Sequence, residues 1–333
     1  MQPIILKESL NKLMPQPCPV NLIRIGGCRD GAYLVPNDLE GIEACFSPGV
    51  NNFKYFEDEL SLRFGIKCHM CDFSSDIENF ETPLINRMQS FEKKWLDIDG
   101  GAESITLEEW VDRHCGKNPG DLLLQIDIEG AEFRNLNSAS LELMNKFRIL
   151  ILELHVPIQT INMHETLEKE FCPLLDKLSQ THICVHLRAN NCCGDFVEKE
   201  TGLNIPNVIE VAYLRRDRFN RDPKYYYRPQ LPHPLDIPFN LPEVAPLHLN
   251  KNWLIDKRRS LESELKICKD FIVYEAEGKP RIISLSYLFR GLASCSNDKV
   301  RSFALRATLA IRLIVFHIYY QIKNLVPLLT KGK

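Results

Sequence analysis

Two apolar runs of the sequence end in residues that can carry charge and move protons. The run LLLQIDIEG places Asp127 and Glu129 directly after its apolar part, and the run ILILELH ends in Glu153 and His155. Charged side chains are poor core residues unless they are paired. In open α/β sheets, however, ligands bind just outside the carboxyl ends of the strands. The two runs therefore predict a ligand site at the ends of two neighbouring buried strands.

The residue types of this cluster suit proton transfer. The unperturbed pKa of histidine lies near neutrality, which makes His155 the candidate general base. Side chains alternate along a strand, so Glu153 and His155 face the same side of the sheet and are expected to form one site. Asp127, Glu153 and His155 offer oxygens and one imidazole, which would also suit magnesium or manganese better than zinc. A third interpretation is a structural network in which His155 caps a strand end and Glu153 pairs with Arg24 or Arg148.

The elements that would position these residues alternate between strands and helices. Apolar runs and helical spacing predict a β-α-β unit with a strand over residues 42–50, a helix over 55–65 and a strand over 66–73. Further strands are expected over residues 122–126, 147–154, 182–188 and 208–216, with a short one over 95–98, and further helices over 106–115, 131–145 and 165–178. Such alternation is typical of a doubly wound, mostly parallel α/β sheet.

The first β-α-β unit has the pattern of a nucleotide or nucleoside site. Its turn, SPGVNN, offers backbone N–H groups at a helix N-terminus. Asp72 ends the second strand, where an acid can accept hydrogen bonds from ribose hydroxyls. The turn lacks the GxGxxG pattern that lets the backbone approach a pyrophosphate, so NAD is disfavoured and S-adenosylmethionine, which has no phosphate, is expected. Glu57 would either accept from the amino group of that cofactor or complement the helix dipole as a first-turn acid.

Six motifs occur in an order that resembles a known family. They are RIGGCRDGAYLVP, CFSPGVNNFKYFEDEL, CHMCDFS, LLLQIDIEGAEF, FRILILELH, and HLRANNCCGD with IPNVIEVAYLRRD, and they cover about residues 20–253. Together they resemble the FkbM-type family of S-adenosylmethionine-dependent methyltransferases. The resemblance implies a Rossmann-like, seven-stranded methyltransferase sheet and O-methylation of sugar or natural-product hydroxyls.

The resemblance also assigns cofactor contacts. It puts Gly49 in the place of the first-motif glycine and Asp72 in the place of the ribose-binding acid. It leaves open whether Asn51 or Asn52 contacts the cofactor, because the first loop contains few glycines. Asp127 would lie beside the sulfonium end of the cofactor.

Methyl transfer to a hydroxyl requires an aligned acceptor and removal of a proton. His155 is expected to remove that proton, while Asp127 and Glu129 hold the sulfonium end of the cofactor or orient the imidazole. A magnesium or manganese ion on Asp127, Glu153 and His155 would instead lower the pKa of the acceptor hydroxyl without a base. The histidine and its neighbouring acids favour the metal-free interpretation.

Polar residues outside this cluster predict acceptor contacts. Arg24 and Asp30 lie in a loop with Gly26 and Gly27, which suggests backbone folded closely over a ligand, or alternatively a buried Arg24–Asp30 pair that holds a lid. The pair Asn190–Asn191 follows the strand over residues 182–188 and would either bind a polyhydroxyl acceptor or form a turn.

Composition excludes other classes of protein. The chain has 333 residues, of which 44% are hydrophobic and 26% charged, as in globular proteins. A net charge of −3 gives no global basic field, so nucleic acid is not an expected partner. The first residues do not resemble a signal peptide, and scattered thiols in a long chain fit a reducing cytoplasm. We therefore expect a cytoplasmic protein whose cysteines are mainly small apolar residues.

The domain organisation changes after residue 216. Residues 1–216 are expected to form the methyltransferase domain, and residues 217–253, rich in proline, a proline-rich arm or linker. Residues 254–333 are expected to form a helical C-terminal extension. Its basic, apolar helix over residues 304–326 would lie peripherally on the inner face of a membrane, near a lipid-linked glycan acceptor, or would form a homo-oligomer contact.

Two functional hypotheses follow from these patterns. The first is an O-methyltransferase that acts on a hydroxyl of a sugar, glycan or glycosylated metabolite. The second is a catalytically degenerate methyltransferase fold that serves as a binding or scaffold module. The few glycines of the first loop favour the second hypothesis, and intact acids at three strand ends favour the first more strongly.

Overall fold

The protein is described here by a computed structural model. The described parts are residues 3–28, 30–156, 167–197, 202–237, 240–253, 273–274 and 280–281. The chain divides into two compact units, Met1–Ile255 and Asp256–Lys333. In the second unit, the described residues form β14 (Val273–Tyr274) and β15 (Pro280–Arg281), which pair antiparallel. The predicted basic helix over residues 304–326 lies outside the described residues, and within these residues no helix is long and apolar enough to cross a membrane.

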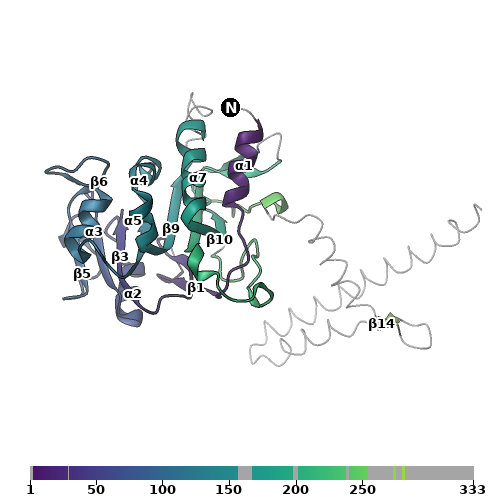
Figure 1. Cartoon of the computed structure of the whole chain (residues 1–333), viewed down its shortest axis with the longest axis horizontal. Coiled ribbons are helices and arrows are strands. Elements are labelled where there is room, and N and C mark those ends of the chain that lie inside the picture. Colours follow the sequence, from purple (N-terminus) through teal and green to yellow (C-terminus); the bar gives the residue numbers. More distant parts are fainter. Residues whose placement is uncertain are drawn as a thin grey trace, which may run out of the picture. The chain divides into compact units, whose positions relative to one another are not determined.

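A seven-stranded sheet forms the centre of the first unit (Figure 1). Its strands, in spatial order, are β10 (His182–Ala189), β13 (Val208–Arg215), β9 (Phe147–His155), β8 (Asp121–Ile126), β3 (Ile42–Pro48), β4 (Lys67–Cys71) and β5 (Gln89–Glu92). β13 is antiparallel to both of its neighbours, and the other neighbouring pairs are parallel. The unit is therefore an α/β protein with a mostly parallel sheet, compatible with a Rossmann-like fold.

The strand order reverses between β3 and β8. From β3 the chain continues through β4 to β5 on one side, whereas β8 pairs on the other side of β3 and continues to β9. Open α/β sheets bind ligands at such a topological switch point, in the crevice at the carboxyl ends of the strands. The sheet thus marks the ends of β3 and β8 as the place for a ligand.

Helices cover both faces of the sheet, but unequally. One face packs against α1 (Pro3–Leu13), α3 (Leu107–Cys115), α4 (Glu132–Ser138), α5 (Leu141–Lys146) and α7 (Cys172–Thr181). The other face packs against α2 (Tyr55–Phe64) and the hairpin of β1 (Leu22–Ile25) and β2 (Tyr33–Pro36). Tyr33 and Phe56 join the hairpin to α2 through an edge-to-face ring contact with centroids 5.6 Å apart. Glu153 of β9 lies on this second face, where it accepts a hydrogen bond from Tyr33 of β2.

Two expected helices differ in detail from the structure. The helix expected over residues 131–145 is interrupted, because Ser140 caps a new helix by accepting a hydrogen bond from the backbone of Leu143. The helix expected over residues 165–178 is a short π-helix, Leu167–Phe171, followed by α7. Single-turn 3₁₀ helices occupy Ile77–Asn79, Arg216–Arg218, Pro223–Tyr225 and Lys251–Trp253.

The short strand expected over residues 95–98 forms, but it lies outside the main sheet. It is β6 (Trp95–Leu96), which pairs with β7 (Ser104–Ile105). The edge strand of the main sheet is β5, which pairs with β4. A further small sheet joins β11 (Asp195–Val197) and β12 (Asn204–Pro206).

Within the described part of the proline-rich segment over residues 217–253, the regular elements are single-turn 3₁₀ helices. The segment belongs to the first compact unit, which ends at Ile255. Trp253 is fully buried, and its Nε1 donates a hydrogen bond of 2.7 Å to the carbonyl oxygen of Asn204. Asn191 donates from its amide to the carbonyl oxygens of Leu241 and Val244, each at 2.9 Å. These contacts hold the segment against the sheet domain.

Candidate functional site

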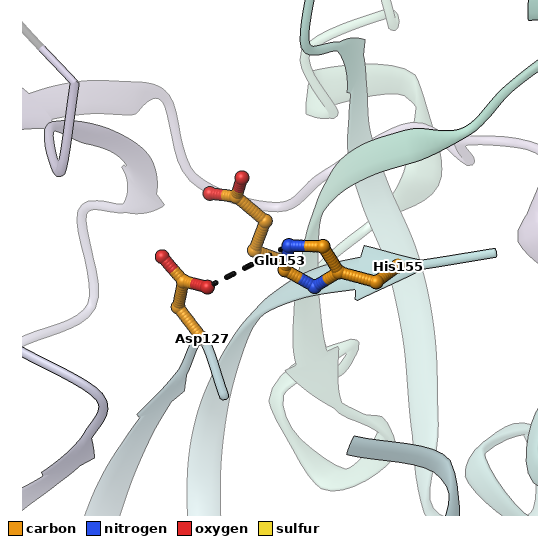
Figure 2. Close-up of side chains that lie close together, drawn as sticks. All are labelled: Asp127, Glu153 and His155. Atoms are coloured by element: carbon orange, nitrogen blue, oxygen red, sulfur yellow. Dashed lines mark ion pairs between the residues drawn. The ribbon is translucent and has the colours of Figure 1, made fainter. Parts of the chain in front are cut away.

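The structure brings the charged ends of the two apolar runs together. Asp127 follows β8, and Glu153 and His155 lie on the same face at the end of β9. A carboxylate oxygen of Asp127, one of Glu153 and an imidazole nitrogen of His155 lie within 4.8 Å of one another. Figure 2 shows the three side chains pointing toward a common point. The predicted joint site at neighbouring strand ends therefore exists as a geometric cluster.

His155 is held by a buried glutamate that sequence reasoning missed. Its Nδ1 lies 3.1 Å from Oε1 of Glu132, whose side chain is fully buried. A carboxylate only accepts hydrogen bonds, so Nδ1 carries the proton in this contact and Nε2 is left as an acceptor in the neutral ring. A base whose ring is oriented by a third group is the arrangement that activates hydroxyl nucleophiles in many enzymes.

The turn between β8 and α4 holds the carboxylate of Glu132 in place. Glu129 and Gly130 both have left-handed backbone, with φ of 55° and 100°. Their conformation aims two backbone N–H groups at Glu132, from Ile128 at 2.8 Å and from Gly130 at 3.1 Å. Gly130 permits the sharp turn expected from the sequence. In the sequence, the one sign of this role is that Glu132 is a second acid directly after that turn.

The open nitrogen of His155 faces two further acids. Nε2 lies 3.4 Å from Oε2 of Glu129 and 4.0 Å from Oδ1 of Asp127. Burial acts to lower the pKa of His155, but the hydrogen bond to Glu132 and the charges of Glu132, Glu153 and Glu129 outweigh it and raise the pKa. The surroundings therefore favour an imidazole that has accepted a proton.

Asp127 keeps an unused acceptor at the centre of the cluster. Its side chain is 27% exposed, yet Oδ1 itself is buried and accepts no hydrogen bond within the described part of the chain. Burial raises the pKa of Asp127 well above its usual range, and the charges of Glu129 and Glu132 raise it further. A nearby positive charge would stabilise the ionised form of this carboxyl group.

Glu153 is held by neutral donors. Its Oε1 accepts from the amide of Asn190 at 2.9 Å, and its Oε2 accepts from the hydroxyl of Tyr33 at 3.2 Å. Burial raises the pKa of Glu153 well above its usual range, with further contributions from Asp127 and other acids. The alternative pairs with arginine do not form: Arg148 bonds to Asp121, and Arg24 bonds to backbone carbonyl oxygens and lies 4.0 Å from Asp236.

A divalent cation and a proton would compete for the same atom, Nε2 of His155. Magnesium or manganese would find oxygens on Asp127 and Glu153 and the Nε2 atom of His155, a donor set that suits these hard cations only in part. Coordination through Nε2 would remove the lone pair that accepts a proton. The cluster can therefore act as a metal site or as a base site, but not as both at once.

The loop after β3 lies against the end of β8. Gly49 has φ of 86°, and a Cβ atom at this position would lie 1.5 Å from the carbonyl oxygen of Asp127. Asn51 and Asn52 continue the loop in left-handed conformation, with φ of 41° and 63°. The backbone N–H of Asn51 donates to Oδ2 of Asp72 at 3.0 Å. The structure thus gathers Gly49, Asn51 and Asp72, three of the predicted cofactor residues, at the ends of β3 and β4.

Asp72 and Glu57 are engaged within the chain. Besides Asn51, Asp72 accepts from the backbone N–H of Ser74 at 2.8 Å and from the hydroxyls of Ser74 and Ser75 at 2.6 and 2.9 Å. Burial acts to raise the pKa of Asp72, but these hydrogen bonds lower it, so the group is ionised. Glu57 lies in the first turn of α2 and accepts from the hydroxyl of Ser47, and burial raises its pKa to about 7.

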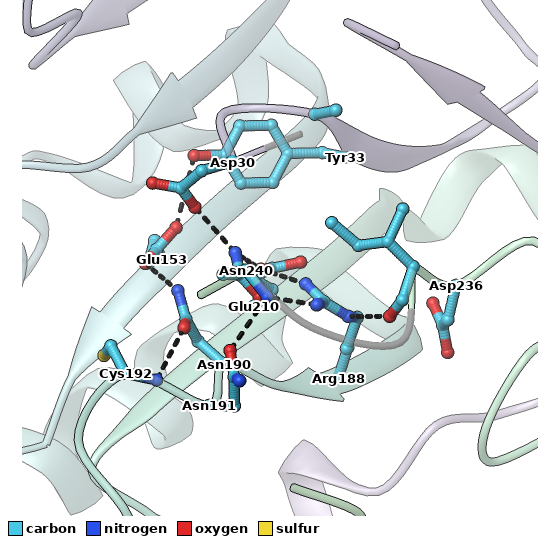
Figure 3. Close-up of polar contacts among 12 residues, drawn as sticks. Asp30, Tyr33, Glu153, Arg188, Asn190, Asn191, Cys192, Glu210, Asp236 and Asn240 are labelled. Carbon is cyan, nitrogen blue, oxygen red and sulfur yellow. Dashed lines mark hydrogen bonds and ion pairs between the residues drawn. The ribbon is translucent and has the colours of Figure 1, made fainter. Parts of the chain in front are cut away.

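The residues predicted to bind the acceptor belong to a connected polar network (Figure 3). Asp30 accepts from the amide of Asn240 at 2.6 Å, and the same amide donates to Glu210 at 3.0 Å. The alternative Arg24–Asp30 pair does not form, because Nη1 of Arg24 donates to the carbonyl oxygen of Ala32. The sequence did not indicate Glu210 or Asn240, which come from β13 and from the proline-rich segment.

Asn190 and Asn191 have different surroundings. Asn190 connects Glu153 to the backbone N–H of Cys192, which donates to its Oδ1 at 3.0 Å. Asn191 is almost fully buried, and its described bonds all go to the backbone of residues 240–245. It therefore anchors the proline-rich segment, in contrast to the predicted acceptor contact.

A pocket of about 190 Å³ lies at the end of β10, next to the proline-rich segment. Its apolar wall includes Leu187, Leu231, Ile237 and Leu249, and Arg188 contributes a polar edge. This pocket is separate from the loop after β3. The candidate site is therefore defined by the ends of β8 and β9 and not by this pocket.

Comparison with known proteins adds no assignment to this geometry. A scan of the chain against protein-family models finds no match, and a search of curated proteins finds no match either.

Proposed function

We propose that the protein is an S-adenosylmethionine-dependent O-methyltransferase that acts on a hydroxyl of a sugar, glycan or glycosylated metabolite. The observation that carries the proposal is the Glu132–His155 pair at the end of β9, with Nε2 open toward Asp127. A proton acceptor held in one tautomer beside a topological switch point is what hydroxyl methylation needs.

The fold supports this proposal through the position of the loop after β3. That loop brings Gly49 and Asn51 to the crevice between β3 and β8, and Asp72 lies next to it. We propose that the cofactor lies along this loop and that the sheet is the methyltransferase sheet implied by the sequence resemblance. The cofactor supplies an electrophilic methyl group on a positively charged sulfur. The carboxyl groups of Asp127 and Glu129 would bind this positively charged sulfur more tightly than a neutral group.

The chain itself would then handle the proton of the acceptor. Nε2 of His155 accepts the proton from the attacking hydroxyl, and Glu132 stabilises the imidazolium that forms. The acids that raise the pKa of His155 make this transfer favourable. A positioned base increases the rate of such a step by roughly 10²–10⁴-fold.

The acceptor side suits neutral polyhydroxyl compounds. Asn190 and Asn240 provide amides, while Asp30, Glu153 and Glu210 provide acceptor oxygens in the same network. Arg188 pairs with Glu210, whereas Asp30 and Glu153 accept from neutral donors and so disfavour phosphate and carboxylate groups. A sugar hydroxyl is therefore favoured over an anionic acceptor.

Cofactor binding provides the first test. A ligand at a hundred times its dissociation constant stabilises the folded state by about 2.7 kcal/mol. We expect S-adenosylhomocysteine to raise the thermal unfolding midpoint, and a panel of methyl glycosides to accept tritiated methyl from S-adenosylmethionine. A chelator control separates base from metal catalysis, because EDTA leaves the rate unchanged only if no metal takes part. Absence of binding by both cofactor forms would refute the proposal.

One observation favours the alternative of a catalytically degenerate binding module. The carboxylate of Asp72 already accepts four hydrogen bonds from Asn51, Ser74 and Ser75, so ribose hydroxyls would have to replace a serine hydroxyl. A degenerate module predicts no thermal shift with the cofactor and no transfer to any glycoside. The same two measurements therefore distinguish the two functions.

A further inference from the structure

Two adjacent thiols lie in contact in the loop after β10. The Sγ atoms of Cys192 and Cys193 are 2.6 Å apart, and Cys193 is exposed. The other exposed cysteine in the described part of the chain is Cys28, which lies far away in the sequence. The loop therefore presents an accessible dithiol.

This dithiol is connected to the candidate site through one side chain. The backbone N–H of Cys192 donates to Oδ1 of Asn190, and the amide of Asn190 donates to Glu153 at 2.9 Å. Figure 3 shows Asn190 lying between Cys192 and Glu153. A conformational change of the peptide group at Cys192 would therefore disturb the side chain of Asn190, which donates the hydrogen bond to Glu153.

We propose that Cys192 and Cys193 form a reversible disulfide with each other when they meet a peroxide, and that this bond loosens the hold of Asn190 on Glu153. The exposed Cys193 thiolate attacks the peroxide, which gives a sulfenic acid and releases hydroxide. The Cys192 thiol then attacks that sulfur, and water leaves. Two thiols and one hydrogen peroxide are converted to one disulfide and two waters. This inference does not depend on the proposed function.

The order of the steps follows from the surroundings of the two thiols. Burial raises the pKa of Cys192, and the neighbouring Cys193 thiol and acidic groups raise it further. Cys192 therefore suits the second step, in which the sulfenic acid already supplies the electrophile. Adjacent Cα atoms lie about 3.8 Å apart, closer than the roughly 4.4–6.8 Å usual for disulfides. Such a bond is strained and is easily reduced again.

Peptide mass measurement tests the bond. Trypsin is expected to release ANNCCGDFVEK, residues 189–199, which contains these two cysteines alone. After treatment with hydrogen peroxide and iodoacetamide, we expect this peptide to have lost two hydrogens and to carry no alkyl group, and dithiothreitol should restore both thiols. Cys193→Ser should abolish the change, and the matched variant Cys28→Ser should keep it. Double alkylation, a sulfinic acid or a disulfide-linked dimer would overturn the proposal.

Nuclear magnetic resonance tests the connection to Glu153. The side-chain amide signal of Asn190, identified by its loss in Asn190→Ala, should shift on oxidation in the Cys28→Ser protein. It should not shift in Cys193→Ser. An oxidised loop with an unchanged Asn190 signal would refute the coupling while leaving the bond itself in place.

Discussion

Replacement of Gly49 tests the closest backbone approach in the candidate site. At Gly49, with φ of 86°, an added Cβ atom would lie 1.5 Å from the carbonyl oxygen of Asp127 and 2.7 Å from its carbonyl carbon. Both atoms belong to backbone, which cannot rotate away as a side chain can. Gly65 offers a matched control, because it has φ of 67° and no atom within 4 Å of an added Cβ.

The two substitutions separate backbone conformation from crowding. A left-handed conformation costs a residue other than glycine roughly 1–2 kcal/mol, and we expect Gly65→Ala to lower the free energy of unfolding by that amount. Overpacking adds about 1–3 kcal/mol. Gly49→Ala is therefore expected to lower the free energy of unfolding by about 2–5 kcal/mol. The difference between the variants measures the contact between the loop after β3 and the end of β8.

Urea unfolding followed by tryptophan fluorescence measures this difference. Trp95, Trp110 and Trp253 are the three tryptophans of the chain, and all lie in the first compact unit. Their signal therefore reports unfolding of the sheet domain. Equal losses in Gly49→Ala and Gly65→Ala would refute the close approach. A change in the slope with urea would show that compactness, and not stability alone, had changed.

Four further predictions concern the site and the extension. His155→Ala should reduce methyl transfer to a glycoside by roughly 10²–10⁴-fold while leaving the calorimetric affinity for S-adenosylhomocysteine unchanged. Glu132→Gln removes a charge that raises the pKa of His155, so the rising limb of the kcat/KM–pH profile should move to lower pH, and more than in Glu129→Gln. The lowered folded-state pKa of Asp72 contributes stability above about pH 4 that is lost as the pH falls, so urea midpoints of Asp72→Asn should depend less on acidic pH; an unchanged dependence would count against the bonds to Asp72. Truncation after Trp253 should preserve cofactor affinity and abolish binding to anionic vesicles; a dimer that becomes a monomer, with no vesicle binding before or after, would support an oligomer contact instead.

The interior strands could be predicted because a strand buried on both faces is a continuous run of apolar residues in the sequence. The strands over residues 122–126 and 147–154 correspond to β8 and β9 within one residue at each end. The edge strand β5 escaped because Gln89–Glu92 is short, half-buried and largely polar. The hairpin β1–β2 and helix α1 were also missed, since their short apolar patterns carry no strong period. Length of the apolar run therefore mattered as well as burial, because β2 is buried along its four residues and was still missed.

The candidate site was predictable only where strand geometry alone placed a residue. Alternation along β9 correctly put Glu153 and His155 on one face. Glu132 was missed, because its role depends on two left-handed residues that turn its carboxylate back toward β9. Asn240 was missed because its contacts with Asp30 and Glu210 join segments far apart in the chain. Local rules cannot supply such long-range partners.

The buried acids at the end of β8 and β9 make the arrival of a cation a proton-releasing event. Burial raises the pKa values of Asp127 and Glu153, so these groups hold protons more readily than free carboxylic acids do. A positive ligand beside them lowers both pKa values and expels protons. Under the proposed function, affinity for the charged cofactor rises with pH, whereas affinity for its neutral product does not. Methyl transfer would thus remove the very charge that these acids attract, and the spent cofactor would leave as they take up protons again.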